Sequence, residues 1–271
     1  MRKVGIIGFG SIGAVVAEAL TNGDVPGGEL TAVGRRHVRL GDALTSPSGV
    51  SIGTAVGVDE LIGSCDIVVE AAGAGVLREH GAAIVESGAD LVVVSSGALL
   101  DDGLRSSLLA GPNAHRVRVA AGAVGGLDIV RAAAAMGTIE SARITTTKKP
   151  AGLVQDHMSE AERASLLALD QAKVLFEGGV RELVASFPSS TNVAASLALA
   201  VGSFELVQGR VVADPNTPRT QHVIELSGAA GEYRFEMTNH PSPTNPRSSG
   251  IVPWSVVCVL RELCASSWSS S

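Results

Sequence analysis

The first residues whose spacing indicates a function are three glycines near the start of the 271-residue chain, which could form a binding turn for a dinucleotide. Gly8, Gly10 and Gly13 have the spacing G-x-G-x-x-G. They follow the apolar run of residues 2–7 and precede residues 14–20, whose apolar side chains have helical spacing. In this context the glycines allow a tight turn, admit a pyrophosphate and let the helix pack on the strand, while the helix N-terminus attracts the phosphates. We therefore predict a dinucleotide site at Gly8, Gly10, Ser11, Ile12 and Gly13.

The end of the second predicted strand bears on which dinucleotide binds. Residues 30–33 form this strand, and Gly34, Arg35 and Arg36 follow it. A site that prefers NAD usually has Asp or Glu here for the ribose 2′-hydroxyl, whereas Arg accommodates the 2′-phosphate of NADP. We predict that Arg35 and Arg36 bind the cofactor, with NADP favoured or both NADP and NAD accepted. The alternative is that both arginines are solvated surface charge.

The elements around these residues predict an α/β protein. Strands expected at 2–7, 30–33, 66–70 and 91–95 alternate with helices at 14–20, 58–64 and 76–87, as in a doubly wound parallel sheet of Rossmann type. After residue 100 the pattern changes. We expect helices after the GAVGG run and at 160–172, near 192–205 and at 251–264, with strands at 115–121, 138–148, 210–213, 221–227 and 232–238. The alternating strands indicate a second, α+β domain with a mixed or antiparallel sheet.

Composition excludes several classes of protein. The net charge of −6 leaves no basic excess for nucleic acid, and no run is long and apolar enough to predict a membrane span. Three cysteines without CxxC spacing favour a reducing cytoplasm over a disulfide framework, and we expect no metal site. The 32 glycines, about 12% against a usual ~7%, predict many tight turns in an apolar, ordered chain.

Five later blocks are much more specific than the glycine spacing. They are, in order, Gly122–Asp128 (GAVGGLD), Thr145–Pro150 (TTTKKP), Phe176–Gly179 (FEGG), Phe187–Ala195, which ends in NVAA, and Asn239–Pro246 (NHPSPTNP). This succession closely resembles the L-aspartate dehydrogenase family over nearly the whole chain. The resemblance implies reversible NAD(P)-dependent oxidative deamination of L-aspartate to oxaloacetate and ammonia through iminosuccinate.

The resemblance also implies a domain organisation. We expect a dinucleotide-binding Rossmann domain at 1–120 and an α+β catalytic and dimerisation domain, like that of dihydrodipicolinate reductase, at 121–242. Residues 243–271 would return to the first domain as a C-terminal helix and end in a flexible Ser-rich tail. The family further implies a homodimer. Gly34 departs from the family at the adenosine end of the cofactor, which argues against simple NAD specificity.

Three site residues are carried over from the family. Ala123 in the GAVGG run and Asn192 in the NVAA run match its cofactor contacts, and His222 matches its proposed catalytic histidine. Oxidation of an amino acid needs a base for the ammonium proton and then an activated water, and a histidine with a pKa near neutrality suits both steps. The residues alone rank His222 before His240 and His157. The resemblance favours His222.

The two carboxylates of aspartate need cationic or hydroxyl partners. We expect Lys148, Arg247 and Ser248 to supply them, and the family-like block Asn245–Ser249 adds Asn245 as a further substrate-binding residue. In this block Arg247 and Ser248 stand where the family more often has Lys and Thr. Because Lys148 and Lys149 are adjacent on a strand, at most one of them should face the pocket. A solvated strand end remains the alternative for these lysines.

Two other functions remain open. One is an NAD(P)-dependent reductase or dehydrogenase that acts on a related amino-dicarboxylate or imine, since pocket shape separates such acids by only ~1–3 kcal/mol per methylene. The other is a dinucleotide-sensing protein without turnover. The presence of His222 argues against a sensor, which needs no group to move protons.

Overall fold

A computed structural model describes residues 1–34, 41–187 and 192–265 of the chain. The chain forms two compact units. The first unit comprises Met1–Gly122 together with the C-terminal segment that begins at Val252, and the second is Ala123–Ile251. Each unit is built on its own β-sheet, so that the chain leaves the first unit, forms the second and returns. Of the helices in the described residues, none is long and apolar enough to cross a membrane.

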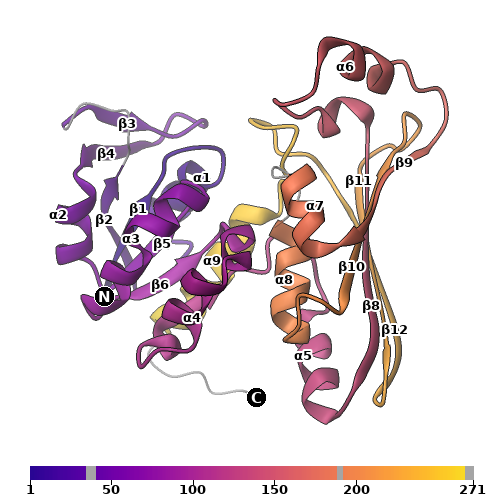
Figure 1. Ribbon diagram of the computed structural model, residues 1–271. Helices are drawn as coiled ribbons and strands as arrows, with labels where there is room; N and C mark the ends of the chain where they lie inside the picture. The colour runs from indigo at the N-terminus through magenta and orange to yellow at the C-terminus, as the bar shows by residue number, and fades with distance from the viewer. Residues whose placement is uncertain (35–40, 188–191, 266–271) are drawn as a thin grey trace. The chain divides into compact units, whose positions relative to one another are not determined.

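The first unit contains a seven-stranded sheet in the order β3-β4-β2-β1-β5-β6-β7 (Figure 1). Its pairs are parallel except β3 with β4, which is antiparallel. The strands are β1 (Arg2–Ile7), β2 (Gly28–Gly34), β3 (Ala43–Thr45), β4 (Ser51–Val56), β5 (Ile67–Glu70), β6 (Asp90–Val93) and β7 (Val117–Val119). The helices are α1 (Gly13–Thr21), α2 (Val58–Ser64), α3 (Ala74–Glu86), α4 (Asp102–Leu109) and α9 (Val252–Cys264).

The core of the first unit joins the start of the chain to its last helix. Val4 and Ile6 on β1 lie in one buried cluster with Val16 on α1 and with Val256 and Leu260 on α9. Two arginines tie the end of α9 to the same unit: Arg2 Nη1 donates to the carbonyl oxygen of Leu263 (3.1 Å), and Arg261 Nε donates to that of Asp24 (2.6 Å). The apolar face of α9 therefore completes the core that β1 and α1 begin.

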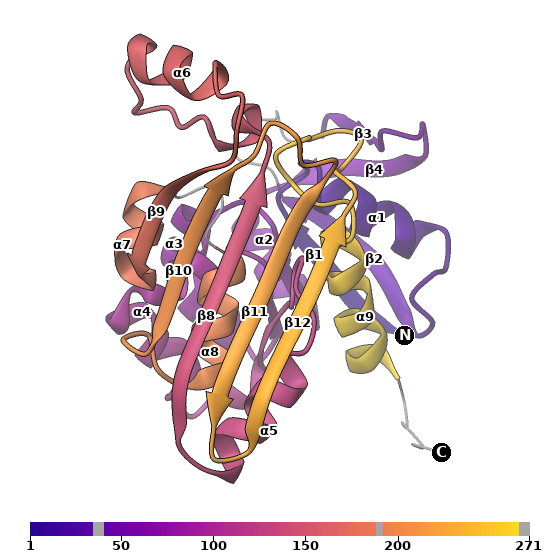
Figure 2. The same ribbon diagram turned by 90° about the vertical axis from the view of Figure 1, so that its right-hand side faces the viewer.

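The second unit contains a five-stranded mixed sheet in the order β12-β11-β8-β10-β9. Only the β8–β10 pair is parallel among its described pairs. The strands are β8 (Ile139–Lys148), β9 (Lys173–Gly179), β10 (Val207–Ala213), β11 (Thr220–Gly228) and β12 (Gly231–Asn239). Helices α5 (Leu127–Met136), α7 (Val180–Ser186) and α8 (Asn192–Val201) cover one face of this sheet, and Figure 2 shows the opposite face without a helix in front of it. The short helix α6 (Glu160–Leu167) stands at one end of the sheet.

These two sheets confirm the predicted α/β fold with a second α+β unit, and two local expectations need correction. The helix expected at 160–172 ends at Leu167, and the missed strand β9 follows it. The strand expected at 115–121 is limited to Val117–Val119 because residues 114–116 form a 3₁₀ turn. The tail expected after residue 265 lies outside the described residues.

The helix-covered face of the second sheet carries polar side chains at one end. Along β8, Ala142, Ile144, Thr146 and Lys148 are buried, as the two-residue period of a strand requires. The first two pack in the core, but the last two bring a hydroxyl and an ammonium group into the same buried row. On the neighbouring β11, His222 is paired with Thr146. Strand alternation and cross-strand register thus bring three polar groups together.

Candidate active site

The glycine turn of the first unit has the geometry that a dinucleotide needs. Gly8 has φ +108°, and a Cβ there would lie 2.5 Å from the carbonyl oxygen of Ala71. A Cβ on Gly13 would lie against the carbonyl oxygen of Gly8, so the helix could not approach the strand as closely. A Cβ on Gly10, in contrast, would meet no atom within 4 Å. The turn is therefore tight at its two ends and open at its middle, where a pyrophosphate would approach.

This difference between the glycines predicts different effects of alanine at each. Gly13→Ala should destabilise the first unit by about 1–3 kcal/mol, because a backbone oxygen occupies the space of the new methyl group. Gly10→Ala should leave the unfolding temperature unchanged but weaken dinucleotide binding about tenfold or more. Thermal unfolding and titration with reduced cofactor separate the two results. Equal losses of stability would show that the middle of the turn is not open.

The adenosine end of this site is expected where β2 ends, beside the first turn of α1. Strand β2 ends at Gly34, and Arg35 and Arg36 lie outside the described residues. Ser11 and Ile12 lie between the glycine turn and α1, and Ile12 gives the helix no side-chain cap. The first turn of α1 therefore has backbone N–H groups at its N-terminus for a phosphate.

His222 is buried in the second unit beside two polar side chains of β8. Its side chain is 3% exposed, and Nδ1 lies 3.0 Å from the hydroxyl oxygen of Thr146. Burial, and to a smaller extent the positive charge of Lys148, lowers the pKa of His222 to about 3. The imidazole is therefore neutral at neutral pH. Its bond to Thr146 fixes the orientation of the ring.

Lys148 is the buried cation of this group. It ends β8 with only 7% of its surface exposed, and burial lowers its pKa to about 8. The Nζ atom donates a hydrogen bond to the carbonyl oxygen of Arg247 at 3.2 Å. Lys148 thus carries most of its positive charge at neutral pH, in surroundings where a carboxylate would interact strongly with it.

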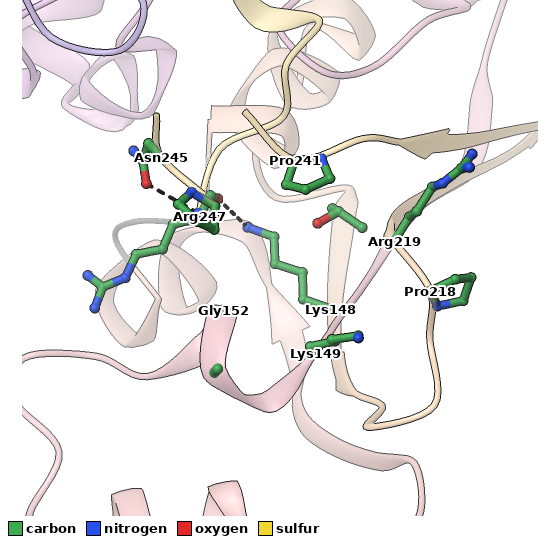
Figure 3. Close-up of a pocket in the computed structure, with 11 residues that line it drawn as sticks. Lys148, Lys149, Gly152, Pro218, Arg219, Pro241, Asn245 and Arg247 are labelled. Carbon is green, nitrogen blue, oxygen red and sulfur yellow. Dashed lines mark hydrogen bonds between the residues drawn. The ribbon is translucent and has the colours of Figure 1, made fainter. Parts of the chain in front are cut away.

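A cavity of about 440 Å³ opens at this end of the second sheet (Figure 3). Four of its lining residues are basic, and none of the described residues that line it is acidic. Arg219 and Arg247 lie on opposite sides of Lys148 in the view of Figure 3. The lining residues are Lys148, Lys149, Ala151, Gly152, Pro218, Arg219, Thr220, Pro241, Asn245, Pro246 and Arg247. Such a lining suits a small molecule with more than one negative charge.

A closed loop after β12 positions two of these residues. Its ends are joined by a bridge between Pro241 and Ser249, and the backbone N–H of Ser248 donates to the carbonyl oxygen of Asn245 (2.9 Å). The side-chain oxygen of Asn245 accepts from the backbone N–H of Arg247 (3.2 Å). Asn245 and Arg247 of this loop both line the cavity. Ser248 stays outside its lining.

The expectation that only one of the two lysines faces the pocket is wrong. Both Lys148 and Lys149 line the cavity. The alternation of strand side chains ends at Lys148, because β8 ends there and a 3₁₀ turn begins at Pro150. Lys149 is exposed, so its charge is better solvated than that of Lys148.

The two residues assigned to the nicotinamide side also lie in the second unit. The carbonyl oxygen of Ala123 accepts a hydrogen bond from the side-chain nitrogen of Asn239 (2.9 Å), which holds the GAVGG segment against the end of β12. Asn192 is the first residue of α8, and its side chain is exposed. The other candidate histidines are less suitable: His240 is exposed, and His157 lines a separate cavity beside Met158.

Comparison with known proteins decides the family. The family model described as "Aspartate dehydrogenase, C-terminal" matches residues 128–263, and that described as "Homoserine dehydrogenase, NAD binding domain" matches residues 8–121. The L-aspartate dehydrogenase of Methanosarcina mazei is 34% identical over 270 residues, which cover 97% of each chain. This chain belongs to the L-aspartate dehydrogenase family. Its first unit therefore carries a binding domain for a nicotinamide dinucleotide, and the resemblance inferred from the five sequence blocks is confirmed.

Solved structures agree with membership of the aspartate dehydrogenase family. The crystal structure of aspartate dehydrogenase from Thermotoga maritima matches with a TM-score of 0.73 and 26% identity over 100% of both chains. A dihydrodipicolinate reductase from Paenisporosarcina matches with a TM-score of 0.50 and 17% identity over 97% of this chain and 95% of that one, which shows the shared fold. The second unit therefore has the expected kind of architecture.

Sequence reasoning missed two polar residues of this aspartate dehydrogenase family site. Arg219 lies just before β11 and lines the cavity, and Thr146 holds His222. The sequence could have indicated Arg219 as a site residue, because it precedes His222 by only three residues and lies in a Pro-rich loop. Thr146 could be found only from the β8–β11 register, which the sequence does not reveal.

Proposed function

We propose that this protein is an NAD(P)-dependent L-aspartate dehydrogenase, an oxidoreductase that converts L-aspartate to oxaloacetate and ammonia through iminosuccinate. Membership of the family, which rests on similarity over most of the chain, supports this activity. The observation that supports L-aspartate as the substrate is a cavity whose four charged lining residues are all basic. A buried imidazole lies next to this cavity. Lys148, Asn245 and Arg247 would bind the carboxylates, with Ser248 in support from the same loop.

The residues of the second unit would then handle the protons. The glycine turn, Ala123 and Asn192 would hold the dinucleotide, which when bound would supply the acceptor of the hydride. His222 takes a proton from the substrate ammonium group and later helps a water molecule to attack the imine carbon. Pairing of a substrate carboxylate with Lys148 neutralises the charge that helps to lower the His222 pKa. Substrate binding would thus make the imidazole a better proton acceptor.

Turnover in both directions tests this function. The purified protein is mixed with L-aspartate and oxidised NAD or NADP, or with oxaloacetate, ammonia and reduced cofactor, while the absorbance of the reduced nicotinamide is followed. We expect turnover in each direction. Tight cofactor binding without turnover in either direction would instead support the sensing protein. Turnover with a different amino-dicarboxylate or imine, and not with L-aspartate, would support the related reductase.

We further propose that NADP is favoured, or that both cofactors are used, through Arg35 and Arg36. Replacing both with alanine should weaken NADPH binding about a hundredfold, because two charge-assisted contacts with the 2′-phosphate are lost. NADH binding should change less than threefold. Fluorescence titration with each reduced cofactor measures both affinities. Equal losses for NADPH and NADH would contradict a role at the 2′-phosphate.

We also propose a homodimer in the cytoplasm. Within the described part of the second unit, no helix covers the face of the sheet opposite α5, α7 and α8, and we propose this face for contact with a second copy of the chain (Figure 2). The proposed location rests on the three cysteines, which have no CxxC spacing and give no disulfide framework in the sequence. Sedimentation of the purified protein tests the dimer, and a monomer at micromolar concentration would contradict it.

A further inference from the structure

Glu70 is a buried carboxylate that the proposed reaction does not use. It is the last residue of β5, and its side chain is 0% exposed. A wholly buried charge is costly unless hydrogen bonds compensate for it. Burial raises the pKa of Glu70, and its hydrogen bonds with Ser95, Gly73 and Ala72 oppose that shift. A buried carboxylate that is costly to place and takes no part in the reaction indicates that its hydrogen bonds have a function of their own.

Four hydrogen bonds reach this carboxylate from two loops. Oε1 accepts from the backbone N–H groups of Ala72 (2.9 Å) and Gly73 (2.8 Å) and from the hydroxyl group of Ser95 (3.0 Å). Oε2 accepts from the backbone N–H of Ser95 (3.1 Å). All four partners are donors, so they fit the ionised form. The carboxylate thereby joins the loop after β5 to the loop after β6.

The same bonds orient the loop after β5 toward the glycine turn. In a trans peptide the carbonyl group points away from the N–H group. Because the N–H of Ala72 points at Glu70, the carbonyl group of Ala71 is directed to the other side, where its oxygen fills the space that a Cβ on Gly8 would take. Glu70 and the glycine turn therefore hold this peptide between them.

The position of Glu70 in the sheet connects it to cofactor binding. It is paired with Ile7, the last residue of β1, and Gly8 follows directly. In the sheet order β2-β1-β5, the chain turns to opposite sides of β1, and in open α/β sheets ligands bind at the carboxyl ends of the strands at such a point. The loop that Glu70 holds thus borders the dinucleotide site.

We propose that Glu70 is a positioning residue for the nicotinamide dinucleotide, because its carboxylate fixes the loop Ala71–Gly73 against the glycine turn before the cofactor binds. The proposal rests on the dinucleotide site and not on the identity of the substrate. Glu70→Gln keeps the shape and one accepting oxygen, but it places an NH₂ group where Oε2 now accepts a bond. Glutamine cannot satisfy all four donors, so the loop should lose its fixed position.

The test is a comparison of three variants by cofactor affinity. Glu70→Gln should raise the Kd for NADH and for NADPH by the same factor, about tenfold or more, whereas kcat at saturating cofactor and the KM for aspartate change less than twofold. Ser95→Ala, which removes one of the four donors, should raise both Kd values about threefold. Ser87→Ala is the control, because this variant also loses a serine hydroxyl, but one that lies before β6 and donates to the backbone carbonyl oxygen of Ile84 rather than to Glu70. Its Kd values should not change.

A purely structural role would give a different result. A folded Glu70→Gln protein with a lower unfolding temperature but unchanged Kd values would overturn the proposal. If Glu70→Gln cannot be obtained folded, Ser95→Ala decides, and unchanged Kd values in that variant overturn it equally. Wild-type protein that binds neither dinucleotide would contradict the dinucleotide site itself. Cofactor binding without aspartate turnover would contradict the proposed function and leave this test intact.

Discussion

Replacing His222 with alanine is expected to lower kcat for L-aspartate by about 10²–10⁴-fold, the usual contribution of a group that transfers protons. The imidazole is the buried titratable group beside Lys148, and Thr146 holds its Nδ1 atom. Steady-state kinetics at saturating cofactor measures the effect. Because His222 is not part of the cavity lining, inhibition by succinate, a simple dicarboxylate, should change less than threefold.

Two further variants complete this test of His222. Thr146→Val removes the hydroxyl group that fixes the ring and should cause a smaller loss of kcat than His222→Ala does. His240→Ala, which alters an exposed histidine, should change kcat less than threefold. A loss below tenfold for His222→Ala together with a large loss for His240→Ala would transfer the proton-transfer role to His240.

Replacing Lys148 with methionine is expected to weaken succinate inhibition and to lower kcat/KM for aspartate by about 10²–10³-fold. A desolvated charge pair is worth about 2–5 kcal/mol when one partner is removed. Lys149→Met is the matched control, because this neighbouring lysine lines the same cavity but is exposed to solvent. Its loss should stay below tenfold. Equal effects of the two variants would contradict the special role of the buried lysine.

The pKa of Lys148 adds a dependence on pH. It is lowered from 10.5 to about 8, so the amine loses its charge as the pH rises through about 8. The inhibition constant for succinate should therefore increase with pH above about 8, and the increase should be absent in Lys148→Met. The folded protein also holds this proton less tightly than the unfolded chain does. Between about pH 8 and 10.5, Lys148 should thus make the free energy of unfolding rise with pH.

Sequence alone predicted the elements whose signals are local. The glycine turn could be predicted because each of Gly8, Gly10 and Gly13 has a backbone role that depends on its neighbours in the sequence. The start of α8 at Asn192 was predicted from a run of alanines and leucines. The hairpin of β3 and β4 was missed because its strands are short and half exposed and contain Gly and Ala, which are depleted in strands.

The candidate site was only partly predictable because tertiary packing decides it. Lys148 and Arg247 were named from their chemistry and Asn245 from the family-like block, and all three line one cavity. The sequence could not show that His222 would be buried and have a pKa of about 3, since its burial depends on the helices that pack on the helix-covered face of the second sheet. Lys149 was judged by strand alternation, which fails where the strand ends.

The most direct test of the basic cavity is the selectivity of the wild-type enzyme for L-aspartate over L-asparagine. The two differ only in the side-chain carboxylate, which the amide replaces at nearly the same size. If Lys148 and Arg247 bind that carboxylate, kcat/KM should be at least about a hundredfold higher for L-aspartate, since an unpaired buried charge would remain with L-asparagine. Comparable kcat/KM values for the two amino acids would contradict the account.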